Sequence, residues 1–226
     1  MKVSKQKAAE NRRALVQAAA RLFGERGIDG VGVAEISKEA GLTHGALYAQ
    51  FASKEALAAE ALTYGLQRGY AWLTATSDDG AHSLADFLDF YLSRRHCDDV
   101  AGGCVMAASA SEIARQDQTI CARFSEGFAL MAGALEAALD GGSPAMGGGD
   151  RRNRALAMAA AMIGGVAVAR ATAKARPALS DELLVAVRRV LGELGGAPPR
   201  PARPASATGQ GAAPRTATRP RRRRRP

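Results

Sequence analysis

The segment GLTHGALYAQF, residues 41–51, carries polar and aromatic groups at a spacing that suits contact with nucleic acid. Thr43 is a good residue to cap a short helix, and His44 and Tyr48 lie one helical turn apart in that helix. The imidazole of His44 can donate to or accept from a base edge, while the Tyr48 hydroxyl can hydrogen-bond a phosphate or the ring can pack on a sugar. The chemistry that these residue types predict is hydrogen bonding to DNA.

Four neighbouring positions extend this candidate DNA-contact surface. Small residues at the start of the short helix allow its backbone to approach closely, and polar residues at its end and at the start of the next helix suit the DNA backbone. These positions are Gly45, Ala46, Gln50 and Lys54.

A helix-turn-helix would place these groups together. Apolar residues at helical spacing predict helices over about 10–25, 33–40, 43–50 and 53–73. Gly41 permits the sharp turn between the second and third of them, and Leu47 points inward with Leu42 and Phe51. On spacing alone an ordinary helical hairpin, with Tyr48 and Phe51 as core aromatics, fits equally well.

The rest of the chain predicts an all-α fold. The 226 residues are 47% hydrophobic but only 5% aromatic, which indicates helices packed closely through small side chains. Further helices are expected near 83–97, 104–117, 119–140, 151–175 and 180–194. The most membrane-like run, residues 155–169, is shorter than the roughly 18 apolar residues of a spanning helix. The amino terminus has no apolar core of a secretion signal, so a cytoplasmic protein is expected.

The net charge of +9 comes from the carboxyl-terminal end. Residues 197–226 contain nine arginines and no acid, which leaves 22 basic and 22 acidic residues in 1–196. Within that neutral body, residues 1–54 have nine Lys and Arg against five Asp and Glu. The tail has almost nothing to bury and is expected to be disordered. It predicts either sequence-independent binding to nucleic acid through counterion release or an extension with little function.

Residues 12–62, above all AEISKEAGLTHGALYAQFASKEAL, resemble the DNA-binding domain of the TetR family of bacterial transcriptional regulators. The matching features are the long first helix, the AxxAG-type turn, the ALY-x-x-F segment and the SKEAL opening of the fourth helix. Two positions depart from the family pattern. Gly32 stands where a Ser or Thr usually caps the second helix, and Ser37 replaces a usual alanine.

The resemblance implies an all-helical homodimer that binds a palindromic operator in double-stranded DNA and is released by a small-molecule effector. By position, Thr43 and Tyr48 would bind phosphate, His44 and Gly45 would lie nearest the bases, and Lys54 would anchor the next helix. The resemblance also divides the chain into a DNA-binding domain (1–52), an effector-binding and dimerisation domain (53–195) and the tail (196–226). The helices near 151–175 and 180–194 would form the dimer interface, or alternatively pack within one subunit.

An effector pocket is expected between the DNA-binding domain and these last two helices. Aromatic and Met side chains cluster there in the sequence, although each could equally belong to the core. The candidates are Trp72, Phe87, Phe90, Tyr91, Met106, Phe124, Phe128 and Met131. Their weak charge predicts an apolar or amphipathic ligand.

Cys104 follows two glycines at the expected start of a helix, where free amides would lower the pKa of its thiol. This position predicts either a thiol that senses oxidants or electrophiles, or a small buried residue. Cys97 and Cys121 are weaker candidates, and the three cysteines suggest neither a disulfide framework nor a metal site. We find no metal, cofactor, phosphate-loop or nucleophile motif, so an enzyme is not expected.

Overall fold

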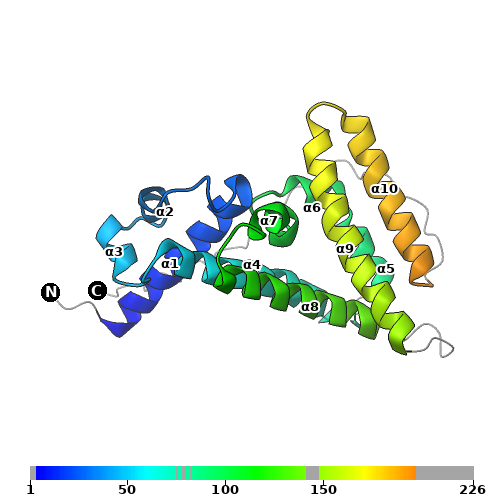
Figure 1. Ribbon diagram of the computed structural model, residues 1–226, viewed down its shortest axis with the longest axis horizontal. Coiled ribbons are helices and arrows are strands. Elements are labelled where there is room, and N and C mark those ends of the chain that lie inside the picture. The colour runs from blue at the N-terminus through cyan, green and yellow to red at the C-terminus, as the bar shows by residue number, and fades with distance from the viewer. Residues whose placement is uncertain (1–3, 75, 78–79, 82, 141–147, 197–226) are drawn as a thin grey trace, which may run out of the picture.

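The computed structural model describes residues 4–74, 76–77, 80–81, 83–140 and 148–196. These residues form an elongated, helical body with the first three helices at one end and the last two at the other (Figure 1). The arginine-rich tail therefore lies outside the described residues, apart from its first position. The predicted all-α fold is confirmed in this part of the chain.

The amino-terminal part contains α1 (Lys5–Arg26), α2 (Val33–Glu39), α3 (His44–Tyr48) and the long α4 (Lys54–Thr74). Helix α1 begins earlier than predicted because the Ser4 side chain caps it, accepting from Lys7 N at 3.1 Å. Ser53 caps α4, accepting from Ala56 N at 3.2 Å. A buried apolar cluster that includes Leu15, Ile36 and Leu47 packs these helices together.

The larger part contains α5 (Leu84–Tyr91), α6 (Arg94–Asp98), α7 (Val105–Ile113), α8 (Gln118–Asp140), α9 (Gly148–Ala173) and α10 (Pro177–Leu194). The prediction of a single helix near 83–97 is wrong. This segment divides into α5 and α6 because Ser93 caps a new helix, accepting from His96 N at 3.1 Å. Between α4 and α5, Thr76–Ser77 and Gly80–Ala81 pair as two short antiparallel strands.

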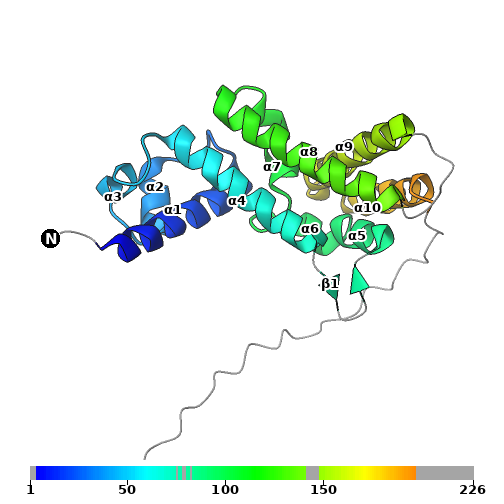
Figure 2. The same cartoon turned by 90° about the horizontal axis from the view of Figure 1, so that it is seen from below.

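Helix α8 connects the two ends of the molecule. It packs along α4 on one side and against α9 on the other, and it can be followed through both views (Figure 2). A second apolar cluster joins α5, α8, α9 and α10, with Met158, Met162 and Val166 of α9 fully buried in it. The amino-terminal end and the α9–α10 end thus have separate apolar cores, and both cores include residues of α8.

Candidate DNA-binding surface and ligand cavity

Helices α2 and α3 are joined by a tight turn at Gly41. Its φ of 67° lies in the left-handed region that favours glycine. Gly41 N donates to Lys38 O at 3.0 Å, and Leu42 N donates to Ser37 O at 2.8 Å, so backbone bonds close the turn. The side chain of Ser37 is buried and donates to Val33 O at 2.9 Å, which explains how a hydroxyl is accommodated there.

The outward face of α3 is the candidate DNA-contact surface. Leu47 is fully buried and fixes the inner face, while Thr43, His44, Gly45 and Tyr48 are exposed. Tyr48 remains 50% exposed, and its ring lies edge-on to His44 with the centroids 5.2 Å apart. Burial of so much aromatic surface would be favourable in a monomer, so its exposure suits contact with a partner.

The remaining predicted positions flank this face and are half-buried: Ala46 within α3, Gln50 just after it, and Lys54 at the start of α4. One prediction is wrong. Thr43 occupies the N-cap position of α3 with an extended backbone, but its side chain makes no capping hydrogen bond. Gly32 likewise provides no side-chain cap for α2, as its lack of a side chain dictates.

Arg12 of α1 fixes the end of α3, and the sequence analysis missed it. Its guanidinium donates to the carbonyl oxygen of Gln50 and to the carboxylate of Glu60, and lies 4.1 Å from the centre of the Phe51 ring. The ring face attracts the cation, while the carbonyl and carboxylate accept its protons. This single side chain therefore joins α1, the end of α3 and α4.

A cavity of about 720 Å³ lies between α4, α5, α6, α7 and α8. Five of the eight predicted pocket residues line it: Phe87, Phe90, Tyr91, Met106 and Met131. The prediction that Phe124 and Phe128 line it is wrong, and both side chains are partly buried and pack against the apolar cores. The side chain of Trp72 lies outside the described part of the structure.

The cavity wall is more polar than the aromatic and Met residues alone predict. Charged side chains on its exposed parts were missed because periodicity does not distinguish them from an ordinary solvated helix face. They are Arg68, Arg95, Asp99, Arg123 and Glu126. Arg123 and Glu126 pair at 2.8 Å, so those two charges partly neutralise each other. The cavity therefore suits an amphipathic ligand whose polar part reaches the charged side chains.

His96 also lines this cavity, and it is uncharged at neutral pH. Burial first, and then the positive charge of Arg170, lowers the pKa of His96 to about 4. Its ring lies 4.8 Å from that of Tyr91 and 5.2 Å from that of Phe90. Its Nε2 atom is buried and has no hydrogen-bond partner within the described residues.

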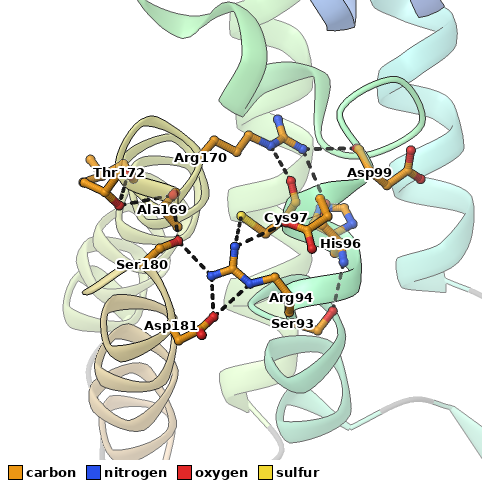
Figure 3. A network of polar contacts seen from close by, with 12 residues as sticks. Ser93, Arg94, His96, Cys97, Asp99, Ala169, Arg170, Thr172, Ser180 and Asp181 are labelled. Atoms are coloured by element: carbon orange, nitrogen blue, oxygen red, sulfur yellow. Dashed lines mark hydrogen bonds and ion pairs between the residues drawn. The ribbon is translucent and has the colours of Figure 1, made fainter. Parts of the chain in front are cut away.

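Helix α6, which carries His96, is held by two arginines (Figure 3). Arg170 of α9 donates to the carbonyl oxygens of Cys97 at 2.8 Å, Asp99 at 3.3 Å and His96 at 3.4 Å. Arg94 reaches from α6 to α10, where it donates to Ser180 Oγ at 2.8 Å and Asp181 Oδ1 at 2.5 Å. These bonds fix one wall of the cavity to the last two helices.

Cys104 lies on the cavity wall, at the N-cap of α7. Its sulfur accepts from Ala107 N at 3.4 Å and from the Tyr91 hydroxyl at 2.8 Å. The predicted lowering of the thiol pKa is wrong, because desolvation raises it despite these hydrogen bonds. The same desolvation raises the pKa of Tyr91 well above its usual value. At neutral pH both groups are protonated and act as hydrogen-bonding groups of the wall.

The model of the tetR family of bacterial regulatory proteins matches residues 15–61, which contain α2, the turn and α3. This segment of the chain matches the TetR family. YdgC, an uncharacterized HTH-type transcriptional regulator of Bacillus subtilis (strain 168), is 46% identical over 59 residues, or 26% of this chain. The chain spans only 30% of the length of that relative.

Solved structures of TetR-family regulators share the fold beyond the matched segment. A regulator from Cytophaga hutchinsonii superimposes with a TM-score of 0.68 at 22% identity, covering 85% of this chain and 98% of its own. The reduced form of NemR from E. coli gives 0.64 at 21% identity, with 81% and 96% covered. The matched segment is that of the tetR family of bacterial regulatory proteins, and the solved structures show that the fold extends over most of the chain.

Outside the matched segment, α9 and α10 pack against each other and leave apolar side chains exposed. The exposed ones are Val168, Leu179, Val185, Val190 and Leu194. The segment Gly149–Ala173 of α9 is also long and apolar enough to cross a membrane, with a mean hydropathy of 1.6, so the sequence-based exclusion by length is wrong. Of its most apolar window, 44% is buried inside the fold.

Proposed function

We propose that this TetR-family regulator is a repressor that binds a palindromic operator as a homodimer and is released by a small-molecule effector. The observation that carries the proposal is the exposed face of α3. Thr43, His44 and Tyr48 project from a helix whose inner face is fixed by Leu47 and whose end is fixed by Arg12. A short exposed helix held this firmly suits entry into the major groove.

Each exposed residue has a proposed contact. Thr43 and Tyr48 bind phosphates through their hydroxyls, and the absence of a capping bond leaves the Thr43 hydroxyl able to do so. His44 and Gly45 lie against base edges, and Ala46 keeps the approach close. Gln50 and Lys54 contact the DNA backbone at the side of the groove, where a lysine contributes as a point charge.

The dimer is proposed to form through α9 and α10. Their exposed valines and leucines form an apolar surface that a second copy of the same helix pair would bury, giving a four-helix interface. Two DNA-binding domains in such a dimer would read two half-sites about one helical turn of DNA apart. The apolar character of α9 is explained by its core and interface positions, so we propose a cytoplasmic protein without membrane insertion.

The effector is proposed to occupy the cavity between α4 and α8. Its volume of about 720 Å³ and its aromatic and thioether wall fit a drug-sized amphipathic molecule. The ligand would bind more tightly to a dimer whose two DNA-binding domains are at a separation that does not fit the operator. It would thereby shift the population of dimers away from the operator-binding state. A thiol-based sensor at Cys104 is a less favoured alternative, because desolvation raises the pKa of that thiol.

The proposal is tested by selecting bound sequences from a random duplex library with the full chain. The expected result is an inverted repeat. A variant in which Thr43, His44 and Tyr48 are all replaced by alanine should recover no motif, although it should fold because these side chains are exposed. The same inverted repeat recovered by the triple variant would exclude α3 as the specificity element.

A further inference from the structure

A buried carboxylate connects the cavity-forming part of the chain to the helix-turn-helix. Glu112, near the end of α7, is 9% exposed and uses both carboxylate oxygens on the loop between α1 and α2. Oε2 accepts from Ile28 N at 2.9 Å, and Oε1 accepts from Asp29 N at 2.7 Å. Both donors are backbone amides of the loop, so the buried carboxylate oxygens are paired.

The loop is shaped around this carboxylate. Gly27 has a φ of 77°, and a Cβ added there would lie 2.8 Å from Glu112 Oε2 and 3.2 Å from Oε1. Only glycine therefore allows both the backbone conformation and the close approach. Gln116 makes a third hydrogen bond to this loop, at an exposed position, by donating to Asp29 Oδ1 at 3.1 Å.

The other end of α7 forms part of the cavity wall, through Cys104, Val105 and Met106. Glu112 lies seven residues after Val105 in α7, which corresponds to about 10 Å along the helix axis. The loop that Glu112 holds leads directly into α2, and Arg26 and Glu35 pair across it at 2.6 Å. A displacement of the start of α7 thus has a short, continuous route to the helix-turn-helix.

We propose that Glu112 is a positioning residue that transmits displacement of the cavity wall to the DNA-binding domain. This inference rests on the proposed function, in which occupancy of the cavity changes operator affinity. When a ligand displaces the start of α7, the two Glu112 hydrogen bonds carry the loop at 28–29 with the helix, and α2 and α3 change orientation. Without the carboxylate the two domains still pack through apolar contacts, but the loop no longer follows α7.

Because the ligand is not identified, the test uses a substitution that displaces the start of α7 in its place. A Cβ at Gly65 of α4 would lie 3.2 Å from the Val105 side chain, so Gly65→Val pushes on the cavity end of α7. Operator affinity is measured for the parent, Gly65→Val, Glu112→Gln and the double variant. Arg115→Ala provides the matched background, because Arg115 lies at the same end of α7 and contacts Ser111 O at 2.9 Å rather than the loop.

Gly65→Val should change operator affinity by about tenfold in the parent and in the Arg115→Ala chain. In the Glu112→Gln chain the same substitution should change it by less than about threefold. A purely structural role of Glu112 would lower affinity in both members of each pair and leave the ratio intact. An equal ratio in all three backgrounds, or no effect of Gly65→Val in the parent, overturns the proposal. Gly65→Ala and Glu112→Asp are the milder substitutions if folding fails.

Amide hydrogen exchange separates a failure of this inference from a failure of the proposed function. Gly65→Val should speed exchange at Ile28 and Asp29 in the parent but cause a much smaller change in Glu112→Gln, where the NH2 group of the glutamine cannot accept and one of the two amides has lost its acceptor. If exchange is coupled in this way but no specific operator is found, the proposed regulatory function is refuted, while the role of Glu112 in linking α7 to the loop still holds. Specific operator binding with uncoupled exchange would refute the link alone.

Discussion

The guanidinium of Arg12 donates to the carbonyl oxygen of Gln50, and this bond ties the first helix to the end of the helix that presents Tyr48. Residues 38 apart in the sequence thereby set the orientation of the DNA-contact surface. Because Glu60 and the Phe51 ring contact the same guanidinium, α3 and α4 are positioned as one unit.

Arg12→Ala should lower operator affinity by about tenfold or more and the free energy of unfolding by about 1–3 kcal/mol, since it removes hydrogen bonds to a charged group. Binding titrations with a selected operator and urea unfolding measure the two effects. Arg13→Ala removes the same charge from an exposed neighbouring position and is the control. Equal losses in both variants would mean that charge, not the positioning of α3, is responsible.

Tyr48→Phe should weaken binding to all operators by a similar factor, because it removes a proposed phosphate contact and reads no base. His44→Ala should instead alter the preference among bases at one position of each half-site. Both side chains are exposed, so the free energy of unfolding should change by less than about 0.5 kcal/mol. Titrations against a panel of single-base operator variants would show the difference, and unchanged binding in both would refute the assigned contacts.

Gly41→Ala should destabilise the protein by about 1 kcal/mol, because the left-handed backbone at this turn disfavours a Cβ. No neighbouring atom lies within 4 Å of the added carbon, so the cost is conformational. Gly69→Ala is the matched control: it also meets nothing within 4 Å, but it lies inside α4 and should stabilise by about 0.5–1 kcal/mol. Thermal unfolding should therefore shift in opposite directions for the two variants.

The stability of the protein should decrease as the pH falls from 6.5 towards 4, in part because of His96. Its pKa is lowered from an ordinary 6.5 to about 4, so in this window the unfolded chain binds a proton that the folded chain does not. The wild type should lose on the order of 2 kcal/mol more than His96→Phe between pH 7 and 4.5. Urea unfolding at the two pH values measures this difference, and parallel losses would show that folding does not lower the pKa of His96.

The sequence was sufficient where the determinants are local. The helical spacing of Leu47 and the exposed residues around it predicted α3, and the resemblance over residues 12–62 assigned its role. The division of α5 from α6 at Ser93 was missed because a cap within an apolar run gives a weak signal. Arg12 and Glu112 were missed because isolated charged residues reveal no partner 38 or 84 positions away.

The pocket could be predicted only by region. An aromatic or Met residue between two domains can belong to a core, line a cavity or do both. Phe87 and Tyr91 are core residues that also line the cavity, whereas Phe124 and Phe128 pack against the core without lining it. The Cys104 prediction failed for another physical reason. The helix-end amides were present as expected, but desolvation by the surrounding side chains outweighed them, and only the tertiary structure determines that burial.

The most direct test of the central claim selects bound sequences from a random duplex library, once with the full chain and once with a chain ending at residue 196. The affinity of each chain for the selected sequences is then measured across a salt series. If α3 reads the DNA, both chains recover the same inverted repeat. The nine arginines of the tail then change only overall affinity and the slope against salt. If neither chain recovers a motif and binding disappears with the tail, the protein is a sequence-independent nucleic-acid binder, and the proposed role of α3 is contradicted.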